Sequence, residues 1–454
     1  MISFLPIGGG NEIGANCFYL NFNGNGIILD CGIHPQKTGL ESLPDFNLLN
    51  NKPVDHCLIS HAHQDHIGSL PFLVKKFPYV QIITTPQTRA LAELTLHNSV
   101  SILKKEIQQD DFEFYSHDEV DLLIKMINYK EYKNEFELNS YHHTKEAKVN
   151  CTFYDAGHIL GSAGILLENN NHKIFYTGDI NLTAQTLLPP AEIPKSKVDT
   201  LILETTYGAT DSDLLLDWQS ESLRFAKEAN KILNKGGSIL IPVFSLGKMQ
   251  EMLATIWQLM QNKKLTMVDI YTGGLGTKIN RAYDYNRFVV NMVDEEFELS
   301  SIPQKDYYDI SNPEEFFKSP SIVLASSGMM IKDTSSFLFA KSWIKQKDSA
   351  IFSVGYMDHE TPGYLIANSE KGDEIELPGF AEKMEVKCEI KNFKFSAHAR
   401  REGLLKIVDK LSPDNVILVH GDEEAIDWIG KAILNKRKNI KVFTAQKGKE
   451  IIFP

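Results

Sequence analysis

The chain has 454 residues, and its 47 lysines and arginines against 59 aspartates and glutamates give a formal net charge of −12. With 43% hydrophobic and 23% charged residues, the composition is that of a globular protein of two or three domains, which excludes a long disordered chain. The acidic balance excludes a global basic field that would steer the protein to nucleic acid. Any polyanion must therefore be recognised by a local feature.

The cysteines and the N-terminal segment indicate a compartment. Five cysteines are dispersed along the chain without C-x-x-C pairing, which argues against a disulfide framework and a cysteine zinc knuckle. The N-terminal segment has no basic region and no long apolar run, so no signal peptide is expected. No stretch reaches the roughly 18 apolar residues of a membrane span. We therefore expect a cytoplasmic protein without a membrane partner.

Short strands and glycine-rich turns are predicted for the first part of the chain. A compact apolar strand over residues 55–60 runs straight into HAHQDHIG, and helices are predicted over 67–77 and 87–110. Residues 111–147 are polar and show little patterning. Further strands, each ending beside a small or acidic residue, are predicted at 151–154, 164–167, 173–177 and 199–204.

From about residue 207 helices and strands alternate, which is typical of a parallel α/β unit. Strand-like runs return at 384–390 and 416–420, with helices predicted over 402–411 and 423–435. No repeat or low-complexity linker separates these parts. The α/β unit therefore looks inserted inside the first domain rather than appended to it.

The strongest chemical signal is His61-Ala-His63-Gln-Asp65-His66, which places four metal-capable side chains within one strand-to-loop exit. Imidazole nitrogens and carboxylate oxygens suit zinc, manganese or iron. Along an extended His-x-His both imidazoles point to one side. A polar loop with chance histidines is the alternative, and the buried strand before the motif argues against it.

Three further residues share this position at a strand end. They are His158 in DAGH, Asp179 in TGD and His420 in VILVHGD. Assigning ligands gives two metal sites with one residue between them: His61, His63 and His158 for one ion, Asp65, His66 and His420 for the other, and Asp179 bridging. Two ions about 3.5–4 Å apart hold a bridging hydroxide as nucleophile, and phosphodiesters are the natural substrates of such a centre.

Here the sequence resembles a known family. HxHxDH, the later GH and TGD motifs, and Asp30 at the end of IILD resemble the metallo-β-lactamase superfamily. LETTYG, FSAHA and VHGD match the extra motifs of its β-CASP nucleases through Glu204, His398 and His420. DCGIHP, IPVFSLGKMQE, ASSGMM and VGYMDHETPG also agree, so the resemblance covers nearly the whole chain. It is nearest to the RNA-processing members, which include the endonuclease subunit of the pre-mRNA cleavage and polyadenylation factor and its prokaryotic relatives.

The resemblance implies a role for each motif residue. Glu204 would orient His398, and His398 would contact the scissile phosphate and protonate the leaving oxygen. Asp65 joins these two in the catalytic set, and Asp30 would support the metal loops. The expected substrate contacts are His398 together with Lys248, Ser327, Gly328 and Arg400.

Two of these positions depart from the family pattern. Lys248 replaces the family's arginine and is a point charge rather than a fork. Arg400 stands where an acid is usual, which either changes the surroundings of His398 or adds a phosphate contact. For Ser327 and Gly328 a tight turn without a ligand is the equal alternative.

The fold implied by the resemblance is a metallo-β-lactamase αββα sandwich with an inserted β-CASP α/β domain. The expected boundaries are 1–207 and 382–454 for the sandwich and 208–381 for the insertion, with single-stranded RNA in the cleft between the two. The expected activity is hydrolysis of RNA phosphodiesters with two Zn²⁺, Mn²⁺ being the alternative ion. Endonucleolytic cutting is expected, with 5′-3′ exonuclease action as an addition.

Three alternatives stay open at this point. A thioesterase or lactamase would need neither the inserted domain nor Glu204 and His398. A catalytically inactive partner subunit would have lost metal ligands that are all present here. A DNA nuclease is disfavoured by His420, because DNA-repair members of the family carry an apolar residue there. The RNA target is not determined by the sequence, and specificity is expected from a homodimer or from partners in a processing complex.

Overall fold

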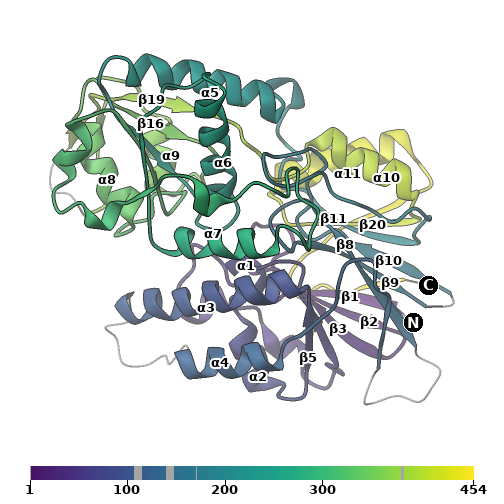
Figure 1. The fold of residues 1–454 in the computed structure, drawn as a ribbon. Helices are drawn as coiled ribbons and strands as arrows, with labels where there is room; N and C mark the ends of the chain where they lie inside the picture. Colours follow the sequence, from purple (N-terminus) through teal and green to yellow (C-terminus); the bar gives the residue numbers. More distant parts are fainter. Residues whose placement is uncertain (1, 107–114, 140–147, 170, 380–382, 454) are drawn as a thin grey trace. The chain divides into compact units, whose positions relative to one another are not determined.

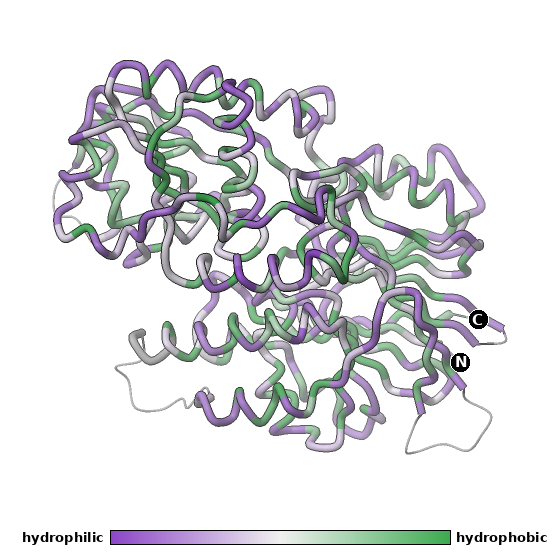
Figure 2. The backbone as a smooth tube through the Cα atoms, viewed as in Figure 1, coloured by the Kyte–Doolittle hydropathy of each residue, from purple (hydrophilic) through white to green (hydrophobic). Residues whose placement is uncertain are grey.

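The computed structural model describes residues 2–106, 115–139, 148–169, 171–379 and 383–453. The chain divides into two compact units and passes from one unit to the other several times. Unit 1 consists of Met1–Thr183, Pro190–Leu214 and His398–Pro454, and unit 2 of Ala184–Pro189 and Leu215–Ala397. Figure 2 shows that the interior segments of each unit are mostly hydrophobic, as separate cores require.

Unit 1 contains two seven-stranded sheets. The first has the strand order β22-β1-β2-β3-β4-β5-β6 and the second β21-β20-β11-β10-β9-β8-β7. The first sheet is made of β1 (Ile2–Gly8), β2 (Cys17–Phe22), β3 (Asn25–Leu29), β4 (His56–Leu58), β5 (Gln81–Thr84), β6 (Asn128–Tyr129) and β22 (Ile451–Phe453). The second is made of β7 (Phe136–Leu138), β8 (Val149–Asp155), β9 (Ala163–Glu168), β10 (Lys173–Tyr176), β11 (Thr200–Glu204), β20 (Asn415–Val419) and β21 (Lys441–Thr444).

The two sheets of unit 1 pack face to face. Phe4 and Phe18 of the first sheet share one buried apolar cluster with Phe153 and Ile165 of the second. Helices cover the outer faces, as Figure 1 shows for α10 and α11 over β11 and β20. These helices are α1 (Gln64–Ile67), α2 (Leu70–Lys76), α3 (Pro86–Glu106), α4 (His117–Met126), α10 (Arg401–Leu411) and α11 (Glu423–Lys436). The predicted αββα sandwich is confirmed.

Unit 2 is built on a parallel sheet, as the alternation of helices and strands predicted. Its strand order is β14-β13-β15-β12-β16-β19, and Trp343 is fully buried in its core. The strands are β12 (Ile239–Pro242), β13 (Asp269–Thr272), β14 (Lys305–Asp306), β15 (Ser321–Ala325), β16 (Ala350–Ser353) and β19 (Glu389–Asn392). The helices are α5 (Trp218–Leu233), α6 (Lys248–Gln261), α7 (Leu275–Asn286), α8 (Ser335–Ile344) and α9 (Pro362–Ala367), and β17 (Glu374–Ile375) pairs with β18 (Met384–Glu385).

The expected boundaries at 208 and 382 differ from those of the structural units. Residues 383–397 group with unit 2, because β19 pairs in parallel with β16 and closes the sheet at that edge. Residues 184–189 also belong to unit 2, although they lie inside the segment expected to be sandwich. Pairing between strands so distant in sequence leaves no local pattern that would have marked the boundary near residue 397.

Helices α4, α7 and α9 were absent from the sequence-based expectation. Helix α4 lies in the segment 111–147 that showed no patterning, and a capping box marks its start: the Ser116 hydroxyl accepts from the Glu119 backbone N–H at 3.2 Å. Helix α7 begins after Gly274, whose combination of a φ of 67° with a ψ of −140° suits only glycine. Residues 107–110 of the helix predicted over 87–110 lie outside the described residues. Within the described chain, no helix has the length and apolar character needed to cross a membrane.

A buried carboxylate holds the segment 184–189 in unit 2. Glu251 of α6, 1% exposed, accepts hydrogen bonds from the backbone N–H groups of Thr186 at 2.8 Å, Leu187 at 2.9 Å and Leu188 at 3.2 Å. The indole Nε1 of Trp218 donates to the Thr186 hydroxyl at 2.8 Å. Burial raises the pKa of Glu251 to about 7, although the three N–H donors and the charge of Lys248 oppose the shift.

This shift predicts a pH-dependent contribution to stability that Glu251→Gln removes. The folded state retains the Glu251 proton at a pH where the unfolded chain has released it, so stability falls as pH rises from about 5 to 7. Relative to the variant, the wild-type free energy of unfolding should drop by about 2–3 kcal/mol between pH 5 and pH 8. Thermal unfolding of both proteins across this range is the measurement. A difference that stays constant with pH would contradict the assignment.

Candidate metal centre

Each predicted metal-ligating side chain lies just beyond a buried strand of unit 1. His61 and His63 follow β4, and Asp65 and His66 lie in the single turn of α1. The other three follow one strand each of the second sheet: His158 follows β8, Asp179 follows β10 and His420 follows β20. Because both sheets present strand ends at this edge, residues separated by more than 350 positions in sequence come together.

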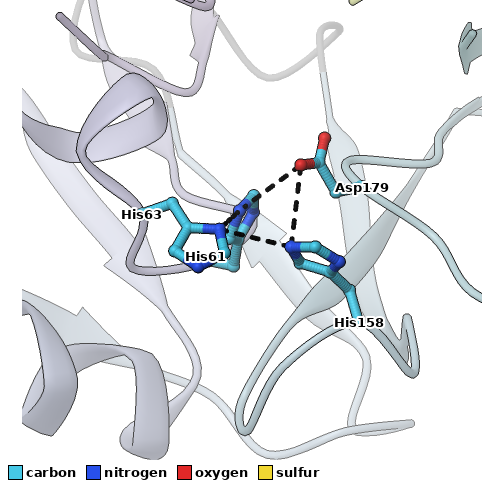
Figure 3. A group of neighbouring side chains, drawn as sticks. All are labelled: His61, His63, His158 and Asp179. Atoms are coloured by element: carbon cyan, nitrogen blue, oxygen red, sulfur yellow. Dashed lines mark hydrogen bonds and ion pairs between the residues drawn. The ribbon is translucent and has the colours of Figure 1, made fainter. Parts of the chain in front are cut away.

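Four of these residues form a compact first group (Figure 3). His63 Nδ1 lies 3.1 Å from His61 Nε2 and 3.2 Å from His158 Nε2. Asp179 Oδ2 lies 3.7 Å from both His61 Nε2 and His158 Nε2. Ligands of a tetrahedral zinc ion with bonds of 2.0–2.1 Å are separated by about 3.3–3.4 Å. The spacing of these atoms therefore fits a zinc-sized cation surrounded by three nitrogens and one oxygen.

Asp65, His66 and His420 form the second group. Asp65 Oδ2 lies 3.5 Å from His66 Nε2 and 3.4 Å from His420 Nε2. Asp179 Oδ1 faces this group, 3.1 Å from His420 Nδ1 and 3.5 Å from His66 Nε2. The two oxygens of Asp179 thus point to different groups, which is the arrangement of a bridging carboxylate.

The charges of the second group also fit a cation. Asp179 Oδ1 is buried and accepts no hydrogen bond from the described residues, which is costly for an anion unless positive charge is supplied. Burial opposes protonation of His66, but the carboxylates of Asp179, Asp65 and Asp30 raise its pKa well above the usual range. Burial would raise the pKa of Asp65, but His66 and His420 hold it well below its ordinary value. A bound cation would supply the charge that these carboxylates otherwise draw from imidazolium.

In the first group, by contrast, the pKa of a histidine is lowered rather than raised. Burial, and then the neighbouring imidazoles of His66, His63 and His158, keep the pKa of His61 well below its ordinary value. His61 is therefore neutral, which is the form that coordinates metal ions. Its Nδ1 lies 3.0 Å from the hydroxyl of Ser60, so its Nε2 is the atom that faces the group.

Asp30, expected to support the metal loops, is the best-connected buried carboxylate here. It is 0% exposed and accepts from the Ser60 N–H at 2.7 Å, the Ser60 hydroxyl at 2.8 Å, and the Tyr176 hydroxyl at 2.6 Å. His66 Nδ1 lies 2.8 Å from it, which leaves Nε2 of that imidazole for the second group. Sequence reasoning missed Ser60 and Tyr176, although both directly precede predicted metal motifs.

Glu204 and His398 form a hydrogen-bonded pair beside both groups. Glu204 Oε1 lies 3.1 Å from His398 Nδ1 and accepts from the Ile180 N–H at 2.9 Å, and Oε2 accepts from the Thr206 N–H at 3.1 Å. Burial would raise the pKa of Glu204, but His398 holds it at about 2. The Glu204 carboxylate is therefore ionised, and both of its oxygens have hydrogen-bond donors. The His398 ring centroid is 4.5 Å from that of His158.

The remaining expected substrate contacts are not part of these groups. Arg400 is the residue that precedes helix α10. The Ser327 hydroxyl accepts from the Ile331 N–H at 3.0 Å in the turn that also holds Gly328. Lys248 Nζ donates to the carbonyl of Phe395 and lies 5.1 Å from the centroid of the Trp218 ring. Lys248 is thus already bonded within unit 2, and its burial lowers its pKa to about 8.

Comparison with protein families assigns three consecutive parts of the chain. Residues 19–206 match the metallo-beta-lactamase superfamily domain, 249–366 the Beta-Casp domain, and 383–445 the Zn-dependent metallo-hydrolase RNA specificity domain. The chain belongs to the metallo-β-lactamase superfamily. Its inserted parallel α/β unit is the β-CASP domain of that superfamily.

Curated relatives of this β-CASP protein match over almost all of it. Cleavage and polyadenylation specificity factor subunit 3 of Dictyostelium discoideum is 30% identical over 98% of this chain and 56% of its own length. Endoribonuclease ysh1 of Schizosaccharomyces pombe is 29% identical over 97% and 57%, and Integrator complex subunit 11 of Danio rerio 29% over 94% and 70%. The chain thus spans little more than half the length of the first two.

A solved structure supports the fold over the full length. A protein of unknown function from Enterococcus faecalis V583 superimposes with a TM-score of 0.57 at 12% sequence identity, covering 100% of both chains. At this identity the likeness concerns the fold of the superfamily protein alone.

We expect Asp30→Asn to weaken the metal centre. An asparagine cannot accept from all four donors, and its NH₂ group would face one of them, so a loss of at least about 3 kcal/mol of folding stability is expected. Metal affinity should fall about 10- to 100-fold, because Ser60 and His66 lose their orienting partner. Calorimetric unfolding and metal titration of the stripped protein measure both.

Tyr176→Phe is the matched control for Asp30→Asn. It removes one of the four donors and should cost about 1 kcal/mol with metal affinity retained. Wild-type metal affinity in Asp30→Asn would show that the carboxylate does not organise the centre.

Proposed function

We propose that this protein is a metal-dependent endoribonuclease that hydrolyses phosphodiester bonds of single-stranded RNA. The observation that carries the proposal is the Glu204–His398 pair held against two groups of metal-ligating side chains. A hydrolase of small neutral molecules needs no such pair, whereas phosphodiester cleavage needs a proton for the leaving oxygen. The match of residues 383–445 to an RNA specificity domain supports RNA over DNA, and the name of one relative, endoribonuclease, supports internal cutting.

The metal ligands, Glu204 and His398 would each have a separate role in the cleavage reaction. When bound, the two cations would supply Lewis-acid charge at the scissile phosphate and lower the pKa of an attacking water. Glu204 stays ionised and holds His398 Nδ1, which fixes the orientation of the His398 ring. His398 is 18% exposed, unlike the fully buried Glu204 carboxylate, so it is the member of the pair that can meet a substrate.

Zinc is the proposed ion for both sites. Three imidazole nitrogens and one carboxylate oxygen in the first group suit Zn²⁺. When Asp179 is counted, the second group offers two carboxylates and two imidazoles, a higher share of oxygen ligands than the first group. Mn²⁺ is therefore the alternative ion there. Five buried, unpaired cysteines support a reducing location such as the cytoplasm. The names of two relatives denote subunits of larger assemblies, which supports partner subunits or a homodimer as the source of RNA specificity.

The activity is tested with one RNA labelled at either its 5′ or its 3′ end. Wild-type protein with Zn²⁺ or Mn²⁺ should release internal fragments, and His398→Ala should lower kcat by about 10²- to 10⁴-fold while retaining its metal. Glu204→Gln should lower kcat in the same direction. Stepwise release of 5′ nucleotides would show the additional exonuclease action. Persistent activity in both His398→Ala and His63→Ala, or equal cleavage of single-stranded DNA, would contradict the proposal.

Metal stoichiometry is a separate prediction. Wild-type protein should bind two divalent ions per chain, and Asp179→Ala should reduce both sites because its two oxygens face both groups. His63→Ala should reduce only the first. His97→Ala is the matched control, since His97 pairs with His117 and Asp121 outside both groups and its loss should change neither site. Elemental analysis after dialysis measures the counts, and fewer than two ions in the wild type would support an inactive partner subunit instead.

A further inference from the structure

Asn16 lies beside the second metal group but is not among the residues that its motifs predicted. It directly precedes β2, it is 0% exposed, and its Nδ2 lies 3.1 Å from His66 Nε2. That imidazole nitrogen is the one available to a metal ion, because Asp30 occupies Nδ1. The Asn16 amide therefore faces the nitrogen through which His66 would bind a cation.

The backbone fixes this amide in place. The Asn16 N–H donates to the carbonyl of Asp65 at 2.9 Å, and its own carbonyl accepts from the N–H of Gly32 at 2.9 Å. Gly32 is the residue that allows this close approach, since a Cβ there would lie only 1.7 Å from the carbonyl oxygen of Asp65. Asn16 is thus bound to the same loop that carries Asp65 and His66, and its side chain cannot move away from the second group.

The other end of the amide has no partner. Asn16 Oδ1 is buried and accepts no hydrogen bond from the described residues. An amide oxygen in this state costs free energy, which a rotation of the amide plane by about 180° can recover if a cation is present. After that rotation the oxygen occupies the place 3.1 Å from His66 Nε2. Neighbouring ligands of an octahedral ion with bonds of 2.0–2.1 Å are separated by about 3.0 Å.

We propose that Asn16 belongs to the second metal site, with its amide against His66 Nε2 and its amide oxygen turned toward the cation when one binds. This inference rests on the proposed two-metal function and adds a residue to it. As a neutral oxygen ligand, Asn16 makes the second ion the more weakly held one, and a carboxylate in its place would hold that ion more tightly.

The test is metal titration of the stripped full-length protein with Zn²⁺ and with Mn²⁺, followed calorimetrically. Asn16→Ala should weaken binding of the second ion about 10- to 100-fold and leave the first unchanged. Asn16→Asp, which has the same shape, should tighten the second ion and is informative even if the alanine variant folds poorly. Substitution with Co²⁺ gives a second readout, since loss of an oxygen ligand changes the visible absorption of the second site.

Asn25→Ala is the matched control, because Asn25 is an equally buried asparagine in β3 of the same sheet. It should leave both binding steps unchanged. Wild-type binding of the second ion in both Asn16 variants would overturn the inference while leaving the nuclease proposal intact. A wild-type protein that binds no second ion would overturn the two-metal proposal itself, so the two failures are distinguishable.

Discussion

A buried negative charge is stable only when every lone pair has a partner, and the carboxylate of Asp30 sets that requirement for the whole centre. Its donors come from the exit of β4, from α1 and from the end of β10, so it joins both sheets at their shared edge. Asp30 itself adopts a left-handed backbone with φ of 58°, which aspartate tolerates better than most residues. These hydrogen bonds fix the orientations of Ser60 and His66. The Ser60 hydroxyl also contacts His61 Nδ1 and so orients that imidazole as well.

Part of the negative charge behind the net value of −12 is concentrated around this carboxylate. Four acids, Asp30, Asp65, Asp179 and Glu204, lie among imidazoles at one edge of unit 1 rather than on the surface. The two divalent ions proposed for this centre would return about four positive charges there. Under the proposed function, an acidic protein would bind a polyanion at a site where its own negative charge holds cations.

The sequence predicted the site more completely than it predicted the fold. The residues of both metal groups could be found because each closely follows a short apolar strand, and because packed sheets bring such strand ends together. Glu204 and His398 could be found only through the resemblance to the β-CASP motifs, since no apolar strand directly precedes His398. The addition of β19 to the β-CASP sheet could not be found, since its four residues are half-buried or exposed and carry no alternation. Hydrogen-bond partners of Asp30 such as Ser60 and Tyr176 leave no sequence pattern at all.

The same limit explains Lys248, for which the family resemblance implied a substrate contact and the structure gives a hydrogen bond to the backbone. Its ammonium group donates to the carbonyl of Phe395, three residues before His398. One turn along α6, Glu251 holds the segment that begins at Ala184, five residues after Asp179. Helix α6 therefore fixes the backbone of unit 2 at the two places where the chain continues to residues of the metal centre. A carbonyl oxygen needs one donor and not a bidentate fork, so a lysine meets the requirement of this position as well as the arginine it replaces.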